Sequence, residues 1–177
     1  MTRAEQQRTR GDLEEWFDAL LATHGPALSR LASSYTRGQG DRDDLLQEIA
    51  LAIWSALPRF RAECSERTFL FRIAHNRAIA HLGRRRLPTV EADETLDIED
   101  ATPDPERALS IEQEGQRLLS AIRRLPLAHA QVVTLALEGM SYAEIGEVLG
   151  ISETNVGARL TRAREMLRRF LRNPGGR

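Results

Sequence analysis

The chain has 177 residues, and its 25 basic and 26 acidic side chains leave a net charge of −1. The overall charge therefore gives no indication of nucleic-acid binding. A hydrophobic fraction of 41% with 29% charged and 5% aromatic residues excludes disorder throughout and favours an all-α protein over a β-sandwich. The single Cys64 excludes a disulfide-stapled scaffold. Because no signal peptide or long apolar run is present, we expect a cytoplasmic protein without membrane insertion.

Apolar residues recur at helical spacing near the start of the chain. Residues 13–21 and 28–35 predict two packed helices, which Gly25 and Pro26 separate. A polar segment with two glycines follows, and a third helix is predicted over residues 41–57.

This third predicted helix combines an apolar stripe with an acidic surface. Asp41 is its expected N-cap, and Pro58 is expected to stop it. The stripe is formed by Leu45, Leu46, Ile49, Ile53, Trp54 and Leu57. The polar residues fall largely on other faces, where they are free to meet a partner: Asp43, Asp44, Gln47 and Glu48.

A loop over residues 59–65 and a helix over residues 66–86 mix Arg with Phe. These residue types contact phosphates and stack on unpaired bases. Phe60, in the loop beside two Arg, is the better candidate for a base contact, whereas Phe69 and Phe71 serve equally well as core residues.

Metal and catalytic sites are not indicated. The spacing of Cys64, His75 and His81 matches no zinc pattern, and two positions six apart on a helix do not share a face. No phosphate-binding loop, nucleophile elbow or zinc-protease motif is present. We therefore expect no metal, no cofactor and no enzyme activity.

Charge is distributed unevenly along the chain. Residues 59–90 carry eight Arg against two Glu (net +6), residues 91–114 carry ten acids against one Arg (net −9), and residues 151–177 carry seven Arg against two Glu (net +5). The acidic stretch contains Pro and few large apolar residues, as a flexible and self-repelling linker does. The prediction is two small helical domains and a linker: residues 12–87, 105–172 and 88–104, respectively.

The second predicted domain starts at Asp104 and Pro105, an N-cap followed by a first-turn proline. This helix extends to Pro126, and the next helix, residues 127–138, ends at Gly139. Both helices carry apolar residues at helical spacing.

A helix-turn-helix is predicted after them. Ser141 and Glu144 form a capping box that opens a short helix, and Gly150 closes it as a left-handed C-cap. Ser152 then caps a longer helix. A short helix, a glycine turn and a capped longer helix form the DNA-binding motif that places its second helix in the major groove.

The second helix of this motif supplies candidate DNA contacts. Its early exposed residues can reach base edges: Glu153, Thr154, Asn155, Ala158 and Arg159. The later arginines suit phosphates: Arg162, Arg164, Arg168 and Arg169. Gly157 costs about 1 kcal/mol of helix propensity relative to Ala. Two interpretations of this glycine stay open, sequence drift and a close approach to DNA.

Residues 13–172 resemble the extracytoplasmic-function (ECF) sigma factors, small bacterial sigma factors that have regions 2 and 4 and lack region 3. Three segments carry the resemblance: DRDDLLQEIALAIWSALPRF, FLFRIAHNRAIAHLGRRR and YAEIGEVLGISETNVGARLTRAREMLRRF. The resemblance implies an alternative sigma factor of the stress-response kind that binds core RNA polymerase, recognises a promoter and melts it. Region 2 then corresponds to residues 12–87 and region 4 to residues 105–172.

The resemblance also implies site residues. Contacts with core polymerase are implied for Asp44, Leu45, Gln47, Glu48 and Trp54. Contacts with the minus-ten strand, including capture of a flipped-out base by the loop, are implied for Phe60, Arg61, Ser65, Asn76, Arg77, Arg84, Arg85 and Arg86. Contacts with the minus-thirty-five element are implied for Ser152, Glu153, Thr154, Asn155, Arg159, Arg162 and Arg164.

The implied partners are the β′ clamp helices and β flap of core RNA polymerase, promoter DNA and an anti-sigma factor. Two positions depart from the family pattern. Phe69 stands where the family usually has Trp, and Gly157-Ala158 replaces the usual polar or basic pair. Base readout then depends more on Glu153 and its exposed neighbours.

Two alternatives belong to other functional classes. A stand-alone regulator would bind a two-fold symmetric operator with its helix-turn-helix while the N-terminal domain senses a ligand or dimerises. The basic, aromatic-bearing end of the N-terminal domain argues against it. An anti-sigma or adaptor protein that binds only protein leaves both Arg-rich segments unexplained.

Overall fold

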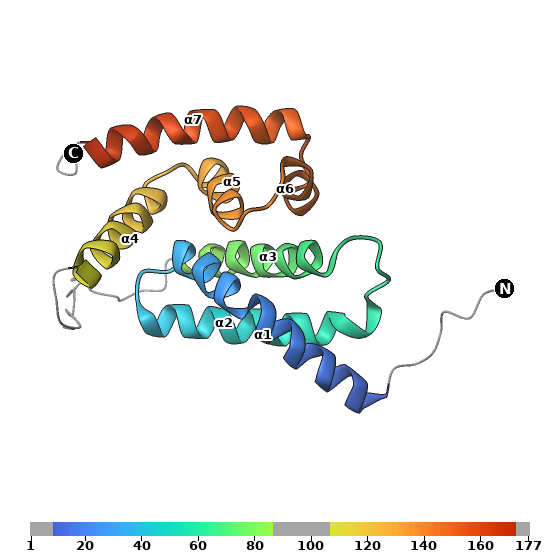
Figure 1. The fold of residues 1–177 in the computed structure, drawn as a ribbon. Helices are drawn as coiled ribbons and strands as arrows, with labels where there is room; N and C mark the ends of the chain where they lie inside the picture. The colour runs from blue at the N-terminus through green and yellow to red at the C-terminus, as the bar shows by residue number, and fades with distance from the viewer. Residues whose placement is uncertain (1–8, 87–106, 173–177) are drawn as a thin grey trace.

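The computed structural model describes residues 9–86 and 107–172 as helices joined by short connections (Figure 1). The N-terminal group consists of α1 (Arg10–Tyr35), α2 (Gln39–Ala56), the 3₁₀ turn η1 (Leu57–Arg59) and α3 (Glu66–Arg86). The C-terminal group consists of α4 (Arg107–Arg123), α5 (Leu127–Leu137), α6 (Tyr142–Leu149) and α7 (Glu153–Arg172). The all-α prediction is confirmed. The predicted linker, residues 88–104, and the predicted helix start at Pro105 lie outside the described residues.

Helix α1 corrects the prediction of two separate helices. It continues through Pro26 for 26 residues, from a capping box between Thr9 and Asp12 to Tyr35. A proline inside a helix removes one backbone hydrogen bond and costs about 3 kcal/mol. The buried side chains on both sides of it, Leu20 and Leu28, pack into one core. Burial of both halves of α1 in this core therefore outweighs the tendency of Gly25 and Pro26 to break the helix.

Helix α2 corrects the predicted N-cap. Its N-cap is Gly38, which makes no side-chain capping bond, whereas Asp41 lies within the first turn. The Asp41 carboxylate instead lies 2.7 Å from His81 Nε2 on α3. A carboxylate in the first turn is also favoured by the positive end of the helix dipole. The predicted stripe and stop are confirmed, since Leu45, Ile49 and Ile53 are buried and η1 follows.

The two groups of helices are packed against each other. In Figure 1, α5 and α6 lie between α3 and α7, and α4 and α5 contact α1. Arg30 on α1 makes a bidentate ion pair with Glu138, with N–O distances of 2.9 and 2.6 Å. The Glu138 side chain is only 5% exposed. Because this carboxylate is buried and paired, the contact between the groups is a specific interface.

Three further polar contacts belong to this interface. Arg67 donates to the Glu138 carbonyl, and Arg72 lies 3.0 Å from a Glu147 carboxylate oxygen. Arg123 donates to the Ser33 carbonyl at 2.7 Å. Arginines of both groups therefore hold the two halves together. Over residues 9–86 and 107–172, none of the helices is long and apolar enough to cross a membrane.

Candidate protein and nucleic-acid interfaces

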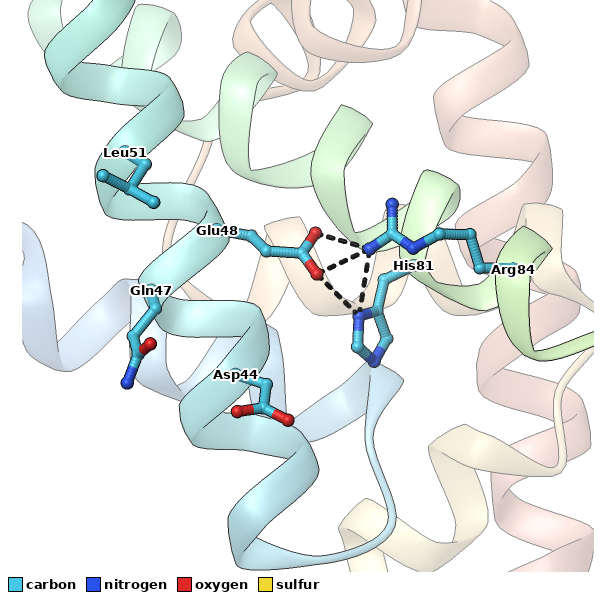
Figure 2. Close-up of a pocket in the computed structure, with 6 residues that line it drawn as sticks. All are labelled: Asp44, Gln47, Glu48, Leu51, His81 and Arg84. Carbon is cyan, nitrogen blue, oxygen red and sulfur yellow. Dashed lines mark hydrogen bonds and ion pairs between the residues drawn. The ribbon is translucent and has the colours of Figure 1, made fainter. Parts of the chain in front are cut away.

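An open depression of about 330 Å³ lies between α2 and α3 and is lined by three of the four predicted partner-facing residues, Asp44, Gln47 and Glu48. The fourth, Asp43, pairs with Arg42 instead. Figure 2 shows Gln47 pointing away from α3 and Asp44 on the front of α2, while Glu48 reaches across to Arg84 and His81. Leu51 borders the same depression and is 67% exposed. The depression therefore combines acidic and amide side chains with an uncovered leucine, a composition suited to a protein partner.

Glu48 is bound to α3 rather than presented freely. The Arg84 guanidinium is 2.6 Å from one Glu48 oxygen, and His81 Nδ1 is 3.5 Å from the same oxygen. Burial alone would raise the pKa of Glu48, but the hydrogen bonds from Arg84 and His81 outweigh it, so the pKa is lowered. Glu48 thus shapes the depression by fixing Arg84 at its edge.

Two predicted polymerase contacts have a structural role here. Leu45 is completely buried, so its side chain is part of the core rather than of the surface. Trp54 is partly buried and packs edge-on against Phe17, with ring centroids 5.3 Å apart. Leu51 was missed by sequence reasoning. The sequence does indicate it, because Leu51 is an apolar residue that lies outside the buried stripe of Leu45, Ile49 and Ile53.

The loop between η1 and α3 begins in an aromatic cluster. The Phe60 ring lies between Trp16 and Phe69, at centroid distances of 5.7 and 4.6 Å. Ala62 has a left-handed φ of 54°. Ser65 accepts from the Thr68 backbone N–H at 3.0 Å, which caps α3. The predicted base-capturing loop is therefore anchored at both ends, with Arg61 exposed between them.

Helix α3 divides its polar residues between two faces. Asn76 and Arg77 are exposed, and Arg77 borders a second open depression with Leu51. Arg67 and Arg72 instead bind the C-terminal group. The side chains of Arg85 and Arg86 lie outside the described part of the structure. Of the predicted minus-ten residues on this helix, Asn76 and Arg77 thus stand open to solvent and Arg84 is paired with Glu48.

His75 lies on the packed face of α3 and is 5% exposed. Its Nδ1 is 3.4 Å from the Tyr35 hydroxyl, and its Nε2 is 3.3 Å from the Gln131 amide nitrogen of α5. Burial lowers the pKa of His75 to about 4, so the ring is neutral at pH 7. His75 and His81 therefore have separate structural partners, and the described residues contain no cluster of three or more metal-ligating side chains.

The predicted helix-turn-helix is confirmed in its local geometry. Ser141 accepts from the Glu144 backbone N–H, and the Glu144 carboxylate accepts from Ser141 N at 2.8 Å. This backbone hydrogen bond, together with the Ser141 hydroxyl, lowers the pKa of Glu144. Gly150 has a left-handed φ of 67°, and Ser152 accepts from the Asn155 backbone N–H at 3.3 Å.

Close packing at the turn depends on a glycine that the sequence analysis did not single out. A Cβ on Gly146 would stand 2.6 Å from the Ile151 carbonyl oxygen, so only glycine permits this approach. The turn sets the direction of α7, whose inner face is formed by Val156, Leu160, Ala163 and Leu167. The outer surface of α7 carries most of the predicted DNA contacts: Glu153, Thr154, Asn155, Ala158, Arg162 and Arg164 are exposed, while Arg159 is half-buried.

Comparison with known proteins accounts for both groups of helices. A family model described as Sigma-70 region 2 matches residues 20–87, and one described as Sigma-70, region 4 matches residues 115–167. RNA polymerase sigma factor NccH of Alcaligenes xylosoxydans xylosoxydans is 34% identical over 163 residues, which cover 89% of this chain and 87% of NccH. ECF RNA polymerase sigma factor SigM of Mycobacterium tuberculosis is 32% identical over 88% of this chain and 76% of SigM.

Solved structures show the same arrangement of helices. The structure of CnrH in complex with the cytosolic domain of CnrY superposes with a TM-score of 0.68 at 30% identity, covering 89% of this chain and 88% of CnrH. The fold also matches Bartonella quintana RpoE, solved with the anti-sigma factor NepR, at a TM-score of 0.69 and 20% identity, over 88% of this chain and 96% of RpoE. The chain belongs to the ECF RNA polymerase sigma factors and is an alternative sigma factor that directs promoter-specific transcription.

Proposed function

We propose that this sigma factor binds core RNA polymerase through the exposed face of α2 and promoter DNA through α3 and α7. The observation that supports the proposal is that one chain presents two different surfaces. The α2–α3 depression combines Asp44 and Gln47 with the uncovered Leu51. Helix α7 presents exposed arginines on a helix-turn-helix. A protein that connects an enzyme to DNA requires both.

The β′ clamp helices of the polymerase are the proposed partner of Asp44, Gln47 and the edge of Trp54, and the β flap is the proposed partner of region 4. In the minus-ten element, the Phe60 loop holds an unpaired base, while Asn76 and Arg77 meet the strand. Unpaired bases that are held in this way stabilise the open duplex, so the protein acts by shifting an equilibrium and not by catalysis.

In the minus-thirty-five element, α7 lies in the major groove. Glu153, Thr154 and Asn155 are exposed at its N-terminal end, where a recognition helix meets base edges. Arg162 and Arg164 are exposed farther along and suit phosphates. Such phosphate contacts fix the register of the helix, and the base contacts select the promoter.

We also propose an anti-sigma factor as a partner, acting in the bacterial cytoplasm where core polymerase is found. CnrH and RpoE, which share this fold, were solved with the partners CnrY and NepR. For this chain, the α2–α3 depression is the surface that such a partner has to cover to block polymerase. The exposed Leu51 supplies an apolar contact there.

Transcription with purified components tests the proposal. The protein is added to core RNA polymerase on supercoiled DNA carrying the region upstream of its own gene. A discrete transcript that requires both protein and core is the expected result. A protein that shifts the DNA alone, gives no transcript and does not co-elute with core would instead be a stand-alone regulator.

The polymerase contact is tested with a pair of charge reversals. Asp44→Arg should abolish co-elution with core polymerase and leave the thermal unfolding midpoint unchanged, because Asp44 is exposed. Asp18→Arg, at another exposed acid, on α1, should co-elute as the wild type does. Equal co-elution of both variants would show that the α2 face is not the interface.

A further inference from the structure

A side chain from another helix lies against Gly157 on α7. A Cβ on Gly157 would stand 3.4 Å from Tyr142 Cε2 and 3.9 Å from Tyr142 Cδ2. Tyr142 is the first residue of α6 and is 41% exposed. Its ring therefore lies against the backbone of the recognition helix while part of the side chain remains open to solvent. A longer side chain at position 157 would compete with the ring for this space.

Helical spacing places this contact at one edge of α7. Gly157 is about a quarter-turn from the inner line of Val156, Leu160 and Ala163, and Arg164 and Arg168 follow it on the same side. Both arginines are exposed. In the row formed by positions 157, 164 and 168, the first position has no side chain of its own, and the Tyr142 ring lies beside it.

The edge of a recognition helix faces a sugar-phosphate strand. The major groove is about 12 Å wide, so a helix that inserts into it has a strand along each side. In a helix-turn-helix the first helix crosses the DNA backbone, and Tyr142 begins that helix. A phenolic O–H is a hydrogen-bond donor that suits a phosphate oxygen.

We propose that Tyr142 donates a hydrogen bond to a backbone phosphate of the minus-thirty-five element, and that Gly157 positions the ring for it. The inference rests on the proposed role of α7 in reading that element. It assigns Gly157 a function without requiring the glycine to touch DNA. The phosphate contact at this edge of α7 then comes from a neutral side chain of α6, in line with the guanidinium groups of Arg164 and Arg168.

The test uses the full chain with core polymerase on the promoter mapped by the transcription assay, and on single base-pair variants of its minus-thirty-five element. Tyr142→Phe removes only the hydroxyl. Gly157→Leu displaces the ring, and Gly115→Leu is its matched control because a Cβ at Gly115, also inside a helix, has no atom within 4 Å. The double variant Tyr142→Phe/Gly157→Leu completes a double-mutant cycle. Promoter affinity is measured for each variant at several salt concentrations.

Tyr142→Phe should lower promoter affinity about tenfold, as expected for the loss of a hydrogen bond to a charged group. The loss should be equal on all base-pair variants, and the salt dependence should be unchanged, because a neutral hydroxyl releases no counterion. Gly157→Leu should give a similar loss, Gly115→Leu none, and the double variant no more than either single change.

Three results would overturn the proposal, either its Tyr142 contact or its role for Gly157, while the wild type remains active. They are unchanged affinity of Tyr142→Phe, an altered preference at one base pair, and a double variant weaker than both single variants. The last result would mean that the leucine itself obstructs DNA. A wild-type protein that gives no transcript with core overturns the proposed function, and this contact with it.

Discussion

Helices α3 and α7 are both rich in arginine, yet most of these arginines have different surroundings on the two helices. On α3, Arg67 and Arg72 bind the C-terminal group and Arg84 binds Glu48. On α7, Arg162 and Arg164 are exposed, and no ion pair holds them within the described residues. The residue type is the same, so the role of each arginine is decided by what faces it.

The position of each helix explains the difference. Helix α3 contacts α1, α2 and α6, so its side chains meet protein on several sides. Helix α7 lies at the outside of the C-terminal group, with α5 and α6 beneath it (Figure 1). An arginine that faces another helix, as Arg67 and Arg72 do, gains a fixed partner during folding. One that faces outward, as Arg162 and Arg164 on α7 and Arg77 on α3 do, stays available for a ligand.

The largest effect is expected from a change at the turn that places α7 on the outside of the C-terminal group. Gly146→Ala places a methyl group 2.6 Å from the Ile151 carbonyl, and backbone atoms cannot turn aside as a flexible side chain can. We expect a loss of about 3 kcal/mol or more in the free energy of unfolding. Urea unfolding measures it, with Gly115→Ala as the control that should be neutral or stabilising. Equal stability of the two variants would mean that the turn is looser than described.

Acid should weaken the packed face of α3. The pKa of His75 falls from 6.5 to about 4 on burial, so between these values the unfolded chain binds a proton that the folded chain does not. The contribution of neutral His75 is complete above about pH 6.5 and is lost as the pH falls toward 4, on the order of 3 kcal/mol in all.

Urea unfolding across this pH range measures the effect. His75→Gln cannot take up the proton, so its stability should fall less steeply with acid than that of the wild type. The same slope for both proteins would place the titrating group elsewhere.

Exchanging one arginine for alanine on each helix tests whether α3 and α7 differ in their effect on promoter binding. Arg159→Ala on α7 should cost about 1 to 3 kcal/mol of promoter binding and relax one base position. Arg72→Ala on α3 should leave base preference unchanged, because its guanidinium is bound to Glu147. Transcription from base-pair variants reports both. Equal losses on all sequences for Arg159→Ala would make it a phosphate contact.

The smallest expected effect is the stability of Arg72→Ala. Its ion pair with Glu147 is 3.0 Å long, and the two side chains are 40% and 45% exposed. Exposed ion pairs contribute about 0 to 1 kcal/mol, so urea unfolding should show a loss below about 1 kcal/mol. A larger loss would indicate that this arginine anchors the interface between the groups.

The features that the sequence predicted well have local causes. The Ser141 capping box, the left-handed Gly150 and the Ser152 cap depend on residues within four positions of each other. The apolar faces of α2 and α7 follow from helical period alone. These local patterns favour the same structure whether or not the rest of the chain is folded. The helix-turn-helix and the polar face of α2 were therefore predictable.

The features that the sequence did not predict depend on distant partners. Pro26 stays inside α1 because both halves of that helix share one core. Asp41 leaves the N-cap role and meets His81, 40 residues away, and Arg30 pairs with Glu138 over 108 residues. No local pattern encodes such pairs. Leu45 was assigned to the polymerase contact from the family resemblance, although the helical period turns its side chain inward.

The anchored loop that starts at Phe60 has a thermodynamic consequence. Packing of Phe60 between Trp16 and Phe69 fixes its first residue, and the Ser65 cap fixes its last. Fixing one residue of a flexible chain costs roughly 1 to 2 kcal/mol of conformational entropy. Because folding has already fixed both ends of this loop, a ligand that docks on it loses less of its interaction energy to ordering the loop.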